Sequence, residues 1–285
     1  MIKKEHIGNY LISYPNSGIE KVGAIEEVAE NSGSCFIFKV KIFIDKKPRN
    51  IVLKMADDYL KIDPSFKLSP KRLAWEYEAL KYFSKISSPR YFPEVLWYDS
   101  ANYVLVMEDI KGKDGLLLKN EIDEGRLHPE IIKDLADFFA DLHLASYKQP
   151  HIINIQSDKN FSDHWLAFLR TEVVDKFYTV GARKVSLASI VEDLLNKSRQ
   201  APQAVIWMDP LPKNIFVHGN SFKLIDFETV AVWDIAWDPA IFISEWIIKS
   251  ASKDRKVSDE AQGVVRMFFS RYLSKIENKI DEKEL

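Results

Sequence analysis

Three polar side chains in the last third of the sequence have the types and spacing needed to hold a metal ion and move a proton. Asp209 and Asn214 form a D-x-x-x-x-N pattern directly after the apolar run 204–208, and Asp226 follows two further apolar runs. Carboxylate and amide oxygens are ligands that Mg²⁺ accepts, and a carboxylate beside a hydroxyl can receive its proton. The sequence therefore predicts a site for metal-assisted chemistry on a hydroxyl group.

The surroundings of this pattern distinguish it from a chance match. Asp45 and Asn50 have the same spacing, but the residues between them are typical of a plain turn. In contrast, Asp209 follows one expected strand, Asn214 opens another, and Asp226 follows an expected hairpin. We expect this order to bring the three side chains to adjacent strand ends. The alternative is that two carboxylates and an asparagine merely form turns.

Phosphoryl transfer is a reaction that such a set of residues could support. It requires divalent metal, a cation on the phosphates that are not transferred, and an acceptor for the hydroxyl proton. The chain contains neither the P-loop pattern G-x-x-x-x-G-K-[ST] nor the dinucleotide pattern G-x-G-x-x-G. The kinase arrangement is the remaining common solution. In it, Asp209 receives the substrate proton while Asn214 and Asp226 hold Mg²⁺.

The elements that must position these residues follow from the hydrophobic pattern. Ser69 and Pro70 match a helix cap followed by a first-turn proline, and a turn is expected at 45–50. Strands are expected at 22–28, 35–44, 51–55, 95–98, 103–107, 204–208, 215–218 and 222–225. Helices are expected at 69–85, 129–147, 161–177, 185–199, 239–249 and 259–280.

This order of elements predicts an α+β chain with two lobes. Residues 1–110 would form a small antiparallel sheet with one helix, and residues 111–285 a mostly helical lobe. The boundary falls near Gly112 and Gly115, where mixed charge interrupts the apolar pattern. A cleft between two lobes is where a nucleotide would bind.

The segment 207–240 resembles the aminoglycoside phosphotransferase and choline kinase family. In that family the loop usually reads H-G-D-x-x-P-x-N and is followed by I-D-[FW]-E and G-D-P-x-x-D-L-A. This chain has, in the same order, Met208-Asp209, Pro212, Asn214, Ile225-Asp226-Phe227-Glu228 and Trp233-Asp234-Ile-Ala-Trp-Asp238-Pro-Ala. Residues 68–109 also resemble methylthioribose kinase, notably at 76–80 and 106–109. The resemblance spans roughly residues 20–245.

The resemblance implies a protein-kinase-like small-molecule kinase that uses ATP and Mg²⁺. The acceptor would be a hydroxyl of a small metabolite such as a sugar, an amino alcohol or an aminoglycoside-like compound. Trp207 and Met208 replace the family's His-Gly, and Trp233 replaces a Gly. The paired arginines of methylthioribose kinases are missing too. The missing arginines argue against methylthioribose as the acceptor, whereas Trp207, Met208 and Trp233 motivate the alternative of a nucleotide-binding pseudokinase or regulatory module.

By the same resemblance, Lys54 is the strand lysine that reaches the α- and β-phosphates. Its partner would be Glu76 on the following helix, with Glu78 as a competitor, and we expect Lys54 to contribute little to folding. Gly33 would lie in the turn that covers the phosphates, although an ordinary hairpin turn explains it nearly as well. The hinge that reads the base would consist of Met107, Glu108, Asp109 and Ile110. The alternatives are a solvated surface lysine for Lys54 and a plain core strand for the hinge.

Other polar and aromatic residues are expected to support the site. Similar kinases have an aspartate whose carboxylate accepts backbone N–H groups of the catalytic loop, and Asp238 matches it. Asp234 would be a cap, His143 a core or loop-bracing histidine, and Cys35 a buried structural thiol. Trp165, Trp237 and Trp246 are expected in the core or in a pocket wall.

Composition limits the partners. The 285 residues carry 40 basic and 42 acidic side chains, a net charge of -2, so we expect no nucleic acid partner. No run approaches the roughly 18 apolar residues of a membrane span, and we expect no signal peptide. The single cysteine excludes an internal disulfide and favours the cytoplasm. The short 226–238 spacing leaves no peptide platform, which favours a small acceptor. ATP against GTP and the oligomeric state stay open.

Overall fold

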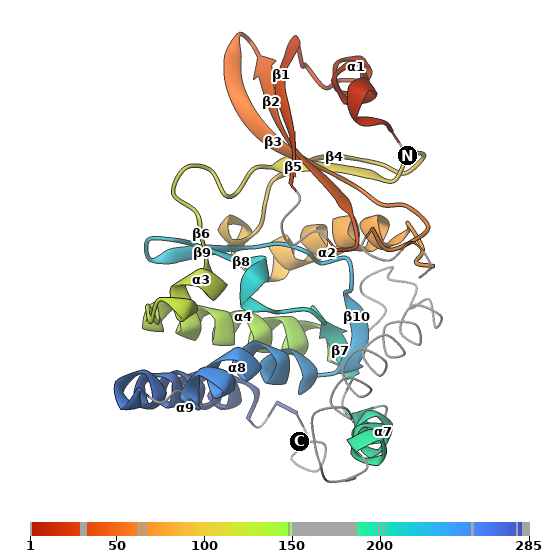
Figure 1. Cartoon of the computed structure of the whole chain (residues 1–285). Helices are drawn as coiled ribbons and strands as arrows, with labels where there is room; N and C mark the ends of the chain where they lie inside the picture. Colours follow the sequence, from red (N-terminus) through yellow and green to blue (C-terminus); the bar gives the residue numbers. More distant parts are fainter. Residues whose placement is uncertain are drawn as a thin grey trace. The chain divides into compact units, whose positions relative to one another are not determined.

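The computed structural model describes residues 2–28, 33–61, 64, 67–147, 149, 187–198, 200–201, 203–251, 254–277 and 279–280. The chain divides into two compact units (Figure 1). The first consists of Met1–Arg126 and Leu211–Thr229, and the second of Leu127–Pro210 and Val230–Leu285. The helix expected at 161–177, with Trp165, lies outside the described residues.

A five-stranded antiparallel sheet forms the centre of the first unit. Its strand order is β1-β2-β3-β5-β4 (Figure 1), and every neighbouring pair is antiparallel. β-branched and aromatic side chains suit such a pleated surface. The strands are β1 (Lys21–Glu27), β2 (Phe36–Ile44), β3 (Lys47–Met55), β4 (Val95–Asp99) and β5 (Val104–Glu108).

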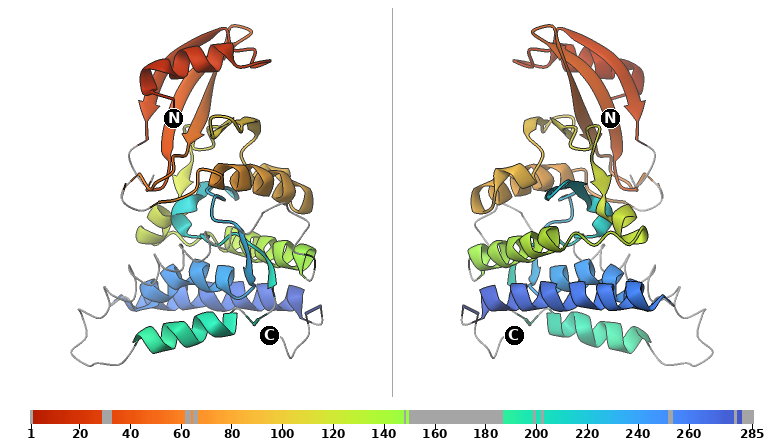
Figure 2. Two further views of the ribbon diagram at one scale, coloured as in Figure 1. Left: turned by 90° about the vertical axis from the view of Figure 1, so that its right-hand side faces the viewer. Right: turned by 90° about the vertical axis from the view of Figure 1, so that its left-hand side faces the viewer.

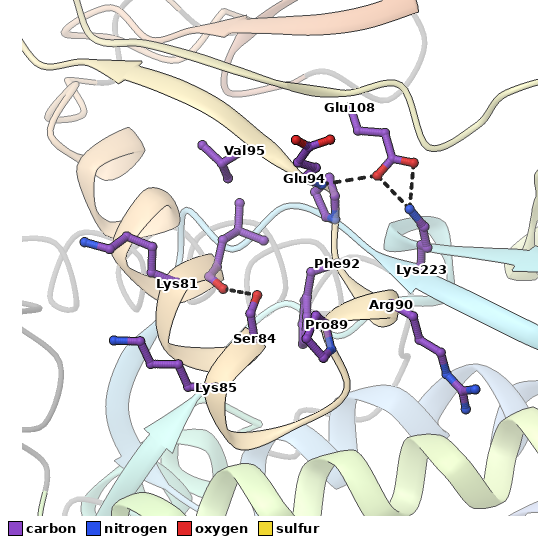
Figure 3. Close-up of a pocket in the computed structure, with 12 residues that line it drawn as sticks. Lys81, Ser84, Lys85, Pro89, Arg90, Phe92, Glu94, Val95, Glu108 and Lys223 are labelled. Atoms are coloured by element: carbon purple, nitrogen blue, oxygen red, sulfur yellow. Dashed lines mark hydrogen bonds and ion pairs between the residues drawn. The ribbon is translucent and has the colours of Figure 1, made fainter.

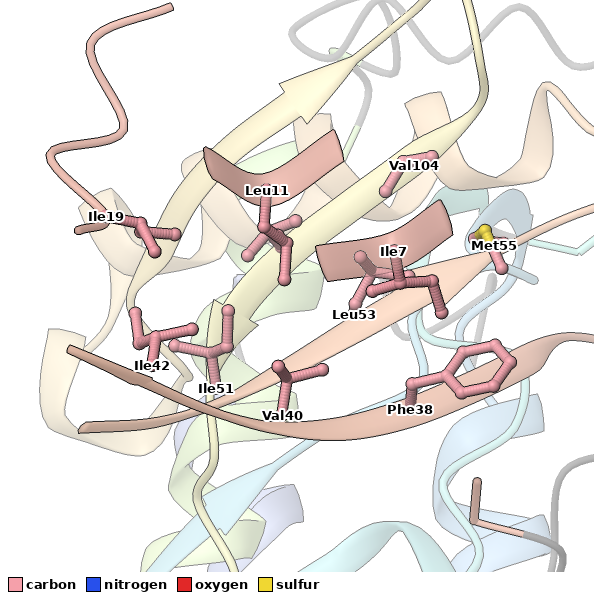
Figure 4. Close-up of a cluster of buried hydrophobic side chains, with 11 residues drawn as sticks. Ile7, Leu11, Ile19, Phe38, Val40, Ile42, Ile51, Leu53, Met55 and Val104 are labelled. Carbon is pink, nitrogen blue, oxygen red and sulfur yellow. The ribbon is translucent and has the colours of Figure 1, made fainter. Parts of the chain in front are cut away.

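The two faces of this sheet bury different kinds of residues, because successive side chains of a strand point to opposite faces. One face is apolar and is covered by α1 (Ile7–Ser13), as Figure 4 shows. The other face includes Lys54 and contacts α2 (Arg72–Ile86) through β4 and β5. The apolar face includes Val40, Ile51, Leu53 and Val106, which pack with Ile7 and Leu11.

The turn expected between the second and third strands is wrong in its length. The β2–β3 loop contains only Asp45 and Lys46, because Ile44 already pairs with Lys47. Both loop residues have positive φ, 49° and 63°, as the tightest hairpin loops require. The expected turn at 45–50 is therefore too long.

Helix boundaries and short elements also differ from the sequence expectation. Helix α2 begins at Arg72 and not at Ser69. Pro70 belongs to a turn that precedes the helix, in which the Leu73 N–H donates to the Pro70 carbonyl. Helix α1 was not expected, since it is short and carries Gly8. Its formation depends on the complete burial of Ile7 and Leu11 against the sheet.

The remainder of the first unit carries the I-D-F-E motif. The strands β6 (Leu116–Leu117), β8 (Ile215–His218) and β9 (Ser221–Leu224) form a small sheet in the order β6-β8-β9. Helix α3 (Leu118–Asp123) and the 3₁₀ turn η5 (Pro212–Asn214) contact it. Phe227 lies edge-on to Phe83 of α2, with ring centroids 5.1 Å apart, and this contact fixes the motif beside the helix.

The second unit is mostly helical. The helices α4 (Pro129–Ser146), α8 (Trp237–Ser250) and α9 (Arg255–Ile276) lie side by side in Figure 2, and α7 (Leu187–Ser198) is a further helix of this unit. Phe139, Phe242 and Phe268 join the first three helices. Strand β7 (Gln203–Ile206) pairs with β10 (Ala231–Asp234). The sequence pattern did not predict β10. Among the described helices, none has the length and apolar character of a membrane span.

Candidate functional site

Lys54 is surrounded by three carboxylates. Its Nζ atom lies 2.7 Å from Glu76 Oε2, 2.6 Å from Asp226 Oδ1 and 3.0 Å from Glu228 Oε2. An ammonium has three N–H donors, so each can serve one carboxylate. The lysine is only 4% exposed. This burial contradicts the expectation that Lys54 contributes little to folding, because a buried charge needs its partners.

The charges in this cluster determine the pKa values of its members. Burial alone would lower the pKa of Lys54, but the carboxylates of Asp226, Glu228 and Glu76 raise it well above its ordinary value. Burial raises the pKa of Glu76 to about 7 despite the nearby ammonium. For Glu228 burial acts in the same direction, but Lys54 and Arg72 outweigh it and lower the pKa to about 2. Glu228 is therefore the permanently charged member.

Arg72 supports this cluster from the side of α2. The side chain is fully buried and donates hydrogen bonds to the backbone carbonyls of Asp57, Leu68, Ser69 and Ser34. Its Nε atom lies 3.9 Å from Glu228 Oε2. Sequence reasoning missed Arg72 and did not assign Glu228, although Glu228 completes the I-D-F-E motif.

Cys35 contacts the cluster at Glu228. Its Sγ atom donates to Glu228 Oε2 at 2.9 Å, and the thiol is buried and free. Burial raises the pKa of this thiol, and the charge of Glu228 adds to the effect. The expected structural thiol is confirmed.

The carboxylates that surround Lys54 could also hold a metal ion. One oxygen each of Glu76, Asp226 and Glu228 lies within 4.8 Å of the others. Above pH 7, where Glu76 is ionised as well, three carboxylates face the two cations Lys54 and Arg72, and the excess of negative charge suits a hard divalent cation with oxygen ligands. Asp226 has the most exposed side chain of the three, at 26%. The donor set therefore fits Mg²⁺ or a similar ion, with Asp226 as its accessible ligand.

Asn214 and Asp226 lie at the same end of the β8–β9 hairpin. The Ile225 N–H donates to the backbone carbonyl of Asn214 at 3.0 Å, one residue before Asp226. Asp226 has a positive φ of 68°, which is uncommon for residues other than glycine and often marks functional positions. This backbone hydrogen bond agrees with the expectation that Asn214 and Asp226 lie close together.

The expected hinge begins inside β5. Met107 pairs with Val52 and Glu108 with Ile51, whereas Asp109 and Ile110 follow the end of the strand. The backbone groups of the last two residues therefore lie beyond the ladder of the sheet. Gly33 is described, but residues 29–32 of the expected phosphate-covering turn lie outside the described part of the chain.

A cavity of 650 Å³ lies elsewhere in the first unit (Figure 3). Leu80, Ser84, Phe92 and Val95 contribute to its lining. Of the residues expected at the site, only Glu108 belongs to this lining, and both of its carboxylate oxygens accept from Lys223, at 2.7 and 2.6 Å. The carboxylate cluster around Lys54 contributes nothing to this lining, so the cavity is not the site that the motifs define.

Asp209 belongs to the second unit and follows β7. The fully buried carboxylate of Asp238 holds the two residues that precede Asp209. Its Oδ2 atom accepts from the Trp207 N–H at 2.7 Å, and its Oδ1 atom accepts from the Met208 N–H at 2.8 Å. His143 Nε2 lies 3.3 Å from Asp238 Oδ2. The expected contacts of Asp238 and the loop-bracing position of His143 are confirmed.

Met208 occupies a strained backbone position. Its φ is 76°, a conformation that glycine adopts without cost and other residues rarely do. The side chain is buried with Ile206 and Trp233, and Trp237 Nε1 donates to the Met208 carbonyl at 3.2 Å. Met208 and Trp233 stand where the family pattern has glycines. The two replacements belong to one buried apolar cluster with Ile206.

The remaining supporting residues have structural positions. Trp246 is fully buried, and Trp237 is half-buried beside the Met208 carbonyl. Asp234 accepts from the Ala236 N–H at 2.9 Å, so it stabilises the turn before α8.

The chain is similar to known phosphotransferases. The sequence model of the "Phosphotransferase enzyme family" matches residues 40–266, well over half of the chain. A 4-hydroxytryptamine kinase of Psilocybe cyanescens is 25% identical over 208 residues. This match covers 66% of the chain and 55% of the relative, so the chain spans little more than half the length of that relative.

Two crystal structures are similar in fold. An aminoglycoside-3'-phosphotransferase of type VIII has a TM-score of 0.54 at 17% identity, with 95% of this chain and 91% of that one covered. A choline/ethanolamine kinase family protein from Mesorhizobium loti has a TM-score of 0.51 at 15% identity, with 95% and 98% covered. These similarities confirm the α+β protein-kinase-like fold expected from the sequence.

The contact between Asp238 and the Trp207–Met208 backbone yields a prediction about stability. Asp238→Asn replaces one acceptor oxygen by an NH₂ group, which leaves one buried backbone N–H without an acceptor. We expect the free energy of unfolding to fall by about 1–3 kcal/mol, as measured by urea denaturation with tryptophan fluorescence. Asp234→Asn, at a half-buried turn, is the control and should cost much less. Equal losses for the two variants would contradict the role of Asp238.

Glu76 yields a prediction about pH. Its pKa is raised to about 7 from an ordinary value of 4.5, so the folded protein retains a proton that the unfolded chain releases. The resulting stability is fully present below pH 4.5 and is lost as the pH rises through 7. Glu76→Gln removes this titration, so the wild type should lose stability relative to the variant between these pH values. The measurement is thermal or urea unfolding at several pH values.

Glu78→Gln is the matched control for this experiment, because Glu78 lies on the same helix with an exposed side chain. Its stability difference from the wild type should stay constant with pH. A constant difference for Glu76→Gln as well would show that Glu76 does not titrate in this range.

Proposed function

Because the chain belongs to the phosphotransferase enzyme family, we propose that it transfers the γ-phosphoryl group of ATP to a hydroxyl group of a small molecule. The observation that carries this proposal is the buried Lys54, which contacts Glu76 and Asp226 at 2.7 and 2.6 Å. A strand lysine, a helix glutamate and a metal-binding aspartate are the charged groups that a kinase site requires.

The nucleotide would bind on the face of the first sheet that carries Lys54. Its ammonium would contact the α- and β-phosphates, and Glu76 would keep it in place. The backbone groups of the hinge, Met107 to Ile110, would read the edge of the base. Gly33 would allow the preceding turn to approach the phosphates closely.

Asn214 and Asp226 would hold Mg²⁺, and Glu228 would add negative charge beside them. When bound, the ion would offset the negative charge of the phosphate oxygens while the γ-phosphoryl group passes to the acceptor hydroxyl and ADP leaves. Asp226 contacts Lys54 in the structure, so this ion pair has to loosen for the lysine to reach a phosphate. The exposed fraction of Asp226 makes it the group best able to exchange partners.

Asp209 would receive the proton of the acceptor hydroxyl as the oxygen attacks the γ-phosphorus. Asp238 fixes the loop before it through the Trp207 and Met208 N–H groups, which supports a defined position for the Asp209 carboxylate. The same observations weigh against the pseudokinase alternative. The replaced residues are accommodated by packing around Met208, and Asp209 itself is retained.

We infer a small acceptor from the short connection that follows the metal-binding motif. Only strand β10 and brief turns separate Asp226 from the start of α8 at Trp237. A protein kinase uses this part of the chain for a long segment that binds peptides. The names of the relatives agree, since they refer to 4-hydroxytryptamine, to choline or ethanolamine, and to an aminoglycoside.

We also propose that residues 1–110 act as the nucleotide-binding lobe and residues 111–285 as the catalytic and substrate-binding lobe. The segment Leu211–Thr229 packs with the N-terminal residues, so the functional division and the compact units do not coincide. The free, buried Cys35 is in keeping with a reducing compartment, and we propose the cytoplasm.

The role of Asp209 yields the test of this proposal. Asp209→Asn should bind ATP with unchanged affinity, whereas phosphoryl transfer should fall by about 10²–10⁴, because the hydroxyl proton loses its acceptor. ADP release would be measured with 4-hydroxytryptamine, choline, ethanolamine and an aminoglycoside as acceptors. Efficient phosphorylation of a general protein substrate, with no stimulation by any small hydroxyl compound, would contradict the proposal.

A further inference from the structure

A second lysine lies on the same face of the sheet as Lys54. Lys39 of β2 pairs with Val52 of β3, which pairs with Met107 of β5, so these three residues form one row across the sheet. Lys54 is two residues after Val52 and therefore points to the same face. The opposite face is the apolar one that α1 covers. Lys39 thus belongs to the face on which the nucleotide is proposed to bind.

Lys39 reaches across this face to the hinge. Its Nζ atom lies 2.6 Å from Asp109 Oδ2. Met107 is two strand spacings away from Lys39, about 10 Å, and Asp109 follows Met107 by two residues. The aliphatic part of the lysine must therefore lie along the sheet near Val52, with only its ammonium at the hinge.

This ion pair differs from a surface ion pair in its burial. The Asp109 carboxylate is 3% exposed and the Lys39 side chain 30%. The Arg49–Glu94 pair of the same unit has a similar distance, 2.6 Å, but its side chains are 37% and 66% exposed. Such exposed pairs contribute little, whereas a buried carboxylate depends on its partner. The pair therefore holds β2 to the hinge.

We propose that Lys39 is a nucleotide-positioning residue, which the sequence motifs do not reveal. This inference rests on the proposed function. The aliphatic stem of Lys39 packs on the flat face of the bound base, and its ion pair with Asp109 closes β2 over the base while the hinge backbone reads its edge. Opening of the ion pair then limits the release of the nucleotide. The phosphates and the transfer step remain the task of Lys54 and the metal ligands.

The rate of nucleotide release tests this inference. N-methylanthraniloyl-ATP with Mg²⁺ would be bound to the full chain and displaced with excess ATP in a stopped-flow fluorimeter. Lys39→Met keeps the stem and removes the charge, and it should speed release by about tenfold, because the close ion pair with Asp109 is lost. Asp109→Asn should have a similar effect. The double variant should be no faster than either single variant.

Two further variants separate positioning from folding. Lys39→Arg keeps the charge and should release the nucleotide at close to the wild-type rate. Arg49→Met removes the exposed ion pair of the same unit and should not change release. Melting temperatures of the nucleotide-free proteins would be measured in parallel, and Lys39→Met should melt below Arg49→Met, because it leaves the buried Asp109 carboxylate without its partner.

The outcomes distinguish this inference from the proposed function. If the wild-type protein binds no nucleotide, the proposed function fails. If it binds and Lys39→Met releases the nucleotide at the wild-type rate, the role of Lys39 is wrong and the proposed function stands. Faster release by Arg49→Met to the same extent would also overturn the inference, because it would reflect a general loosening of the unit.

Discussion

One ammonium group among three carboxylates is the interaction on which the site depends. Lys54 comes from β3, Glu76 from α2, and Asp226 and Glu228 from the segment after β9, so segments more than 170 residues apart converge on a single buried nitrogen. Taking four charges out of water is costly, and only close mutual contacts offset that cost. Above pH 7, where Glu76 is ionised as well, three carboxylates face the two cations Lys54 and Arg72, so the cluster retains negative charge. The carboxylates that hold Lys54 in the fold could therefore also bind a divalent cation.

Each of the two units also has a backbone position that residues other than glycine rarely adopt, Asp226 in the first and Met208 in the second. Asp226 and Met208 both have positive φ. Asp226 is a proposed metal ligand, and Met208 directly precedes Asp209, the proposed proton acceptor. The surroundings hold them there. The Lys54 ion pair fixes the Asp226 side chain, while Asp238 accepts the N–H of Met208. Strain of this kind persists only where neighbouring contacts determine the conformation, and it is concentrated at functional sites. The catalytic loop is thus positioned from within its own unit, through Asp238 and His143.

The sequence predicted the main strands and helices well, because alternating and helical apolar patterns report directly on burial. The resemblance to the aminoglycoside phosphotransferase and choline kinase family also implied the contact of Lys54 with Glu76 and that of Asp238 with the loop, and both are present. It did not predict α1, whose formation depends on packing against a distant sheet. Arg72 was missed for a similar reason: an arginine at a helix start looks solvated until the carbonyls that surround it are known. The burial of Lys54 is likewise a tertiary property, set by carboxylates that are remote in sequence.

The stability of a Lys54→Met variant as a function of pH tests whether this ammonium holds the cluster together. At pH 8 the variant leaves three carboxylates facing one another, and the free energy of unfolding should fall by about 3–5 kcal/mol, as for other buried pairs that lose one partner. At pH 5 the loss should be clearly smaller, because the uncompensated carboxylates can take up protons. Mg²⁺ at pH 8 should restore part of the loss. A change within about 0.5 kcal/mol of zero at both pH values, as for ordinary surface substitutions, would contradict this role of Lys54.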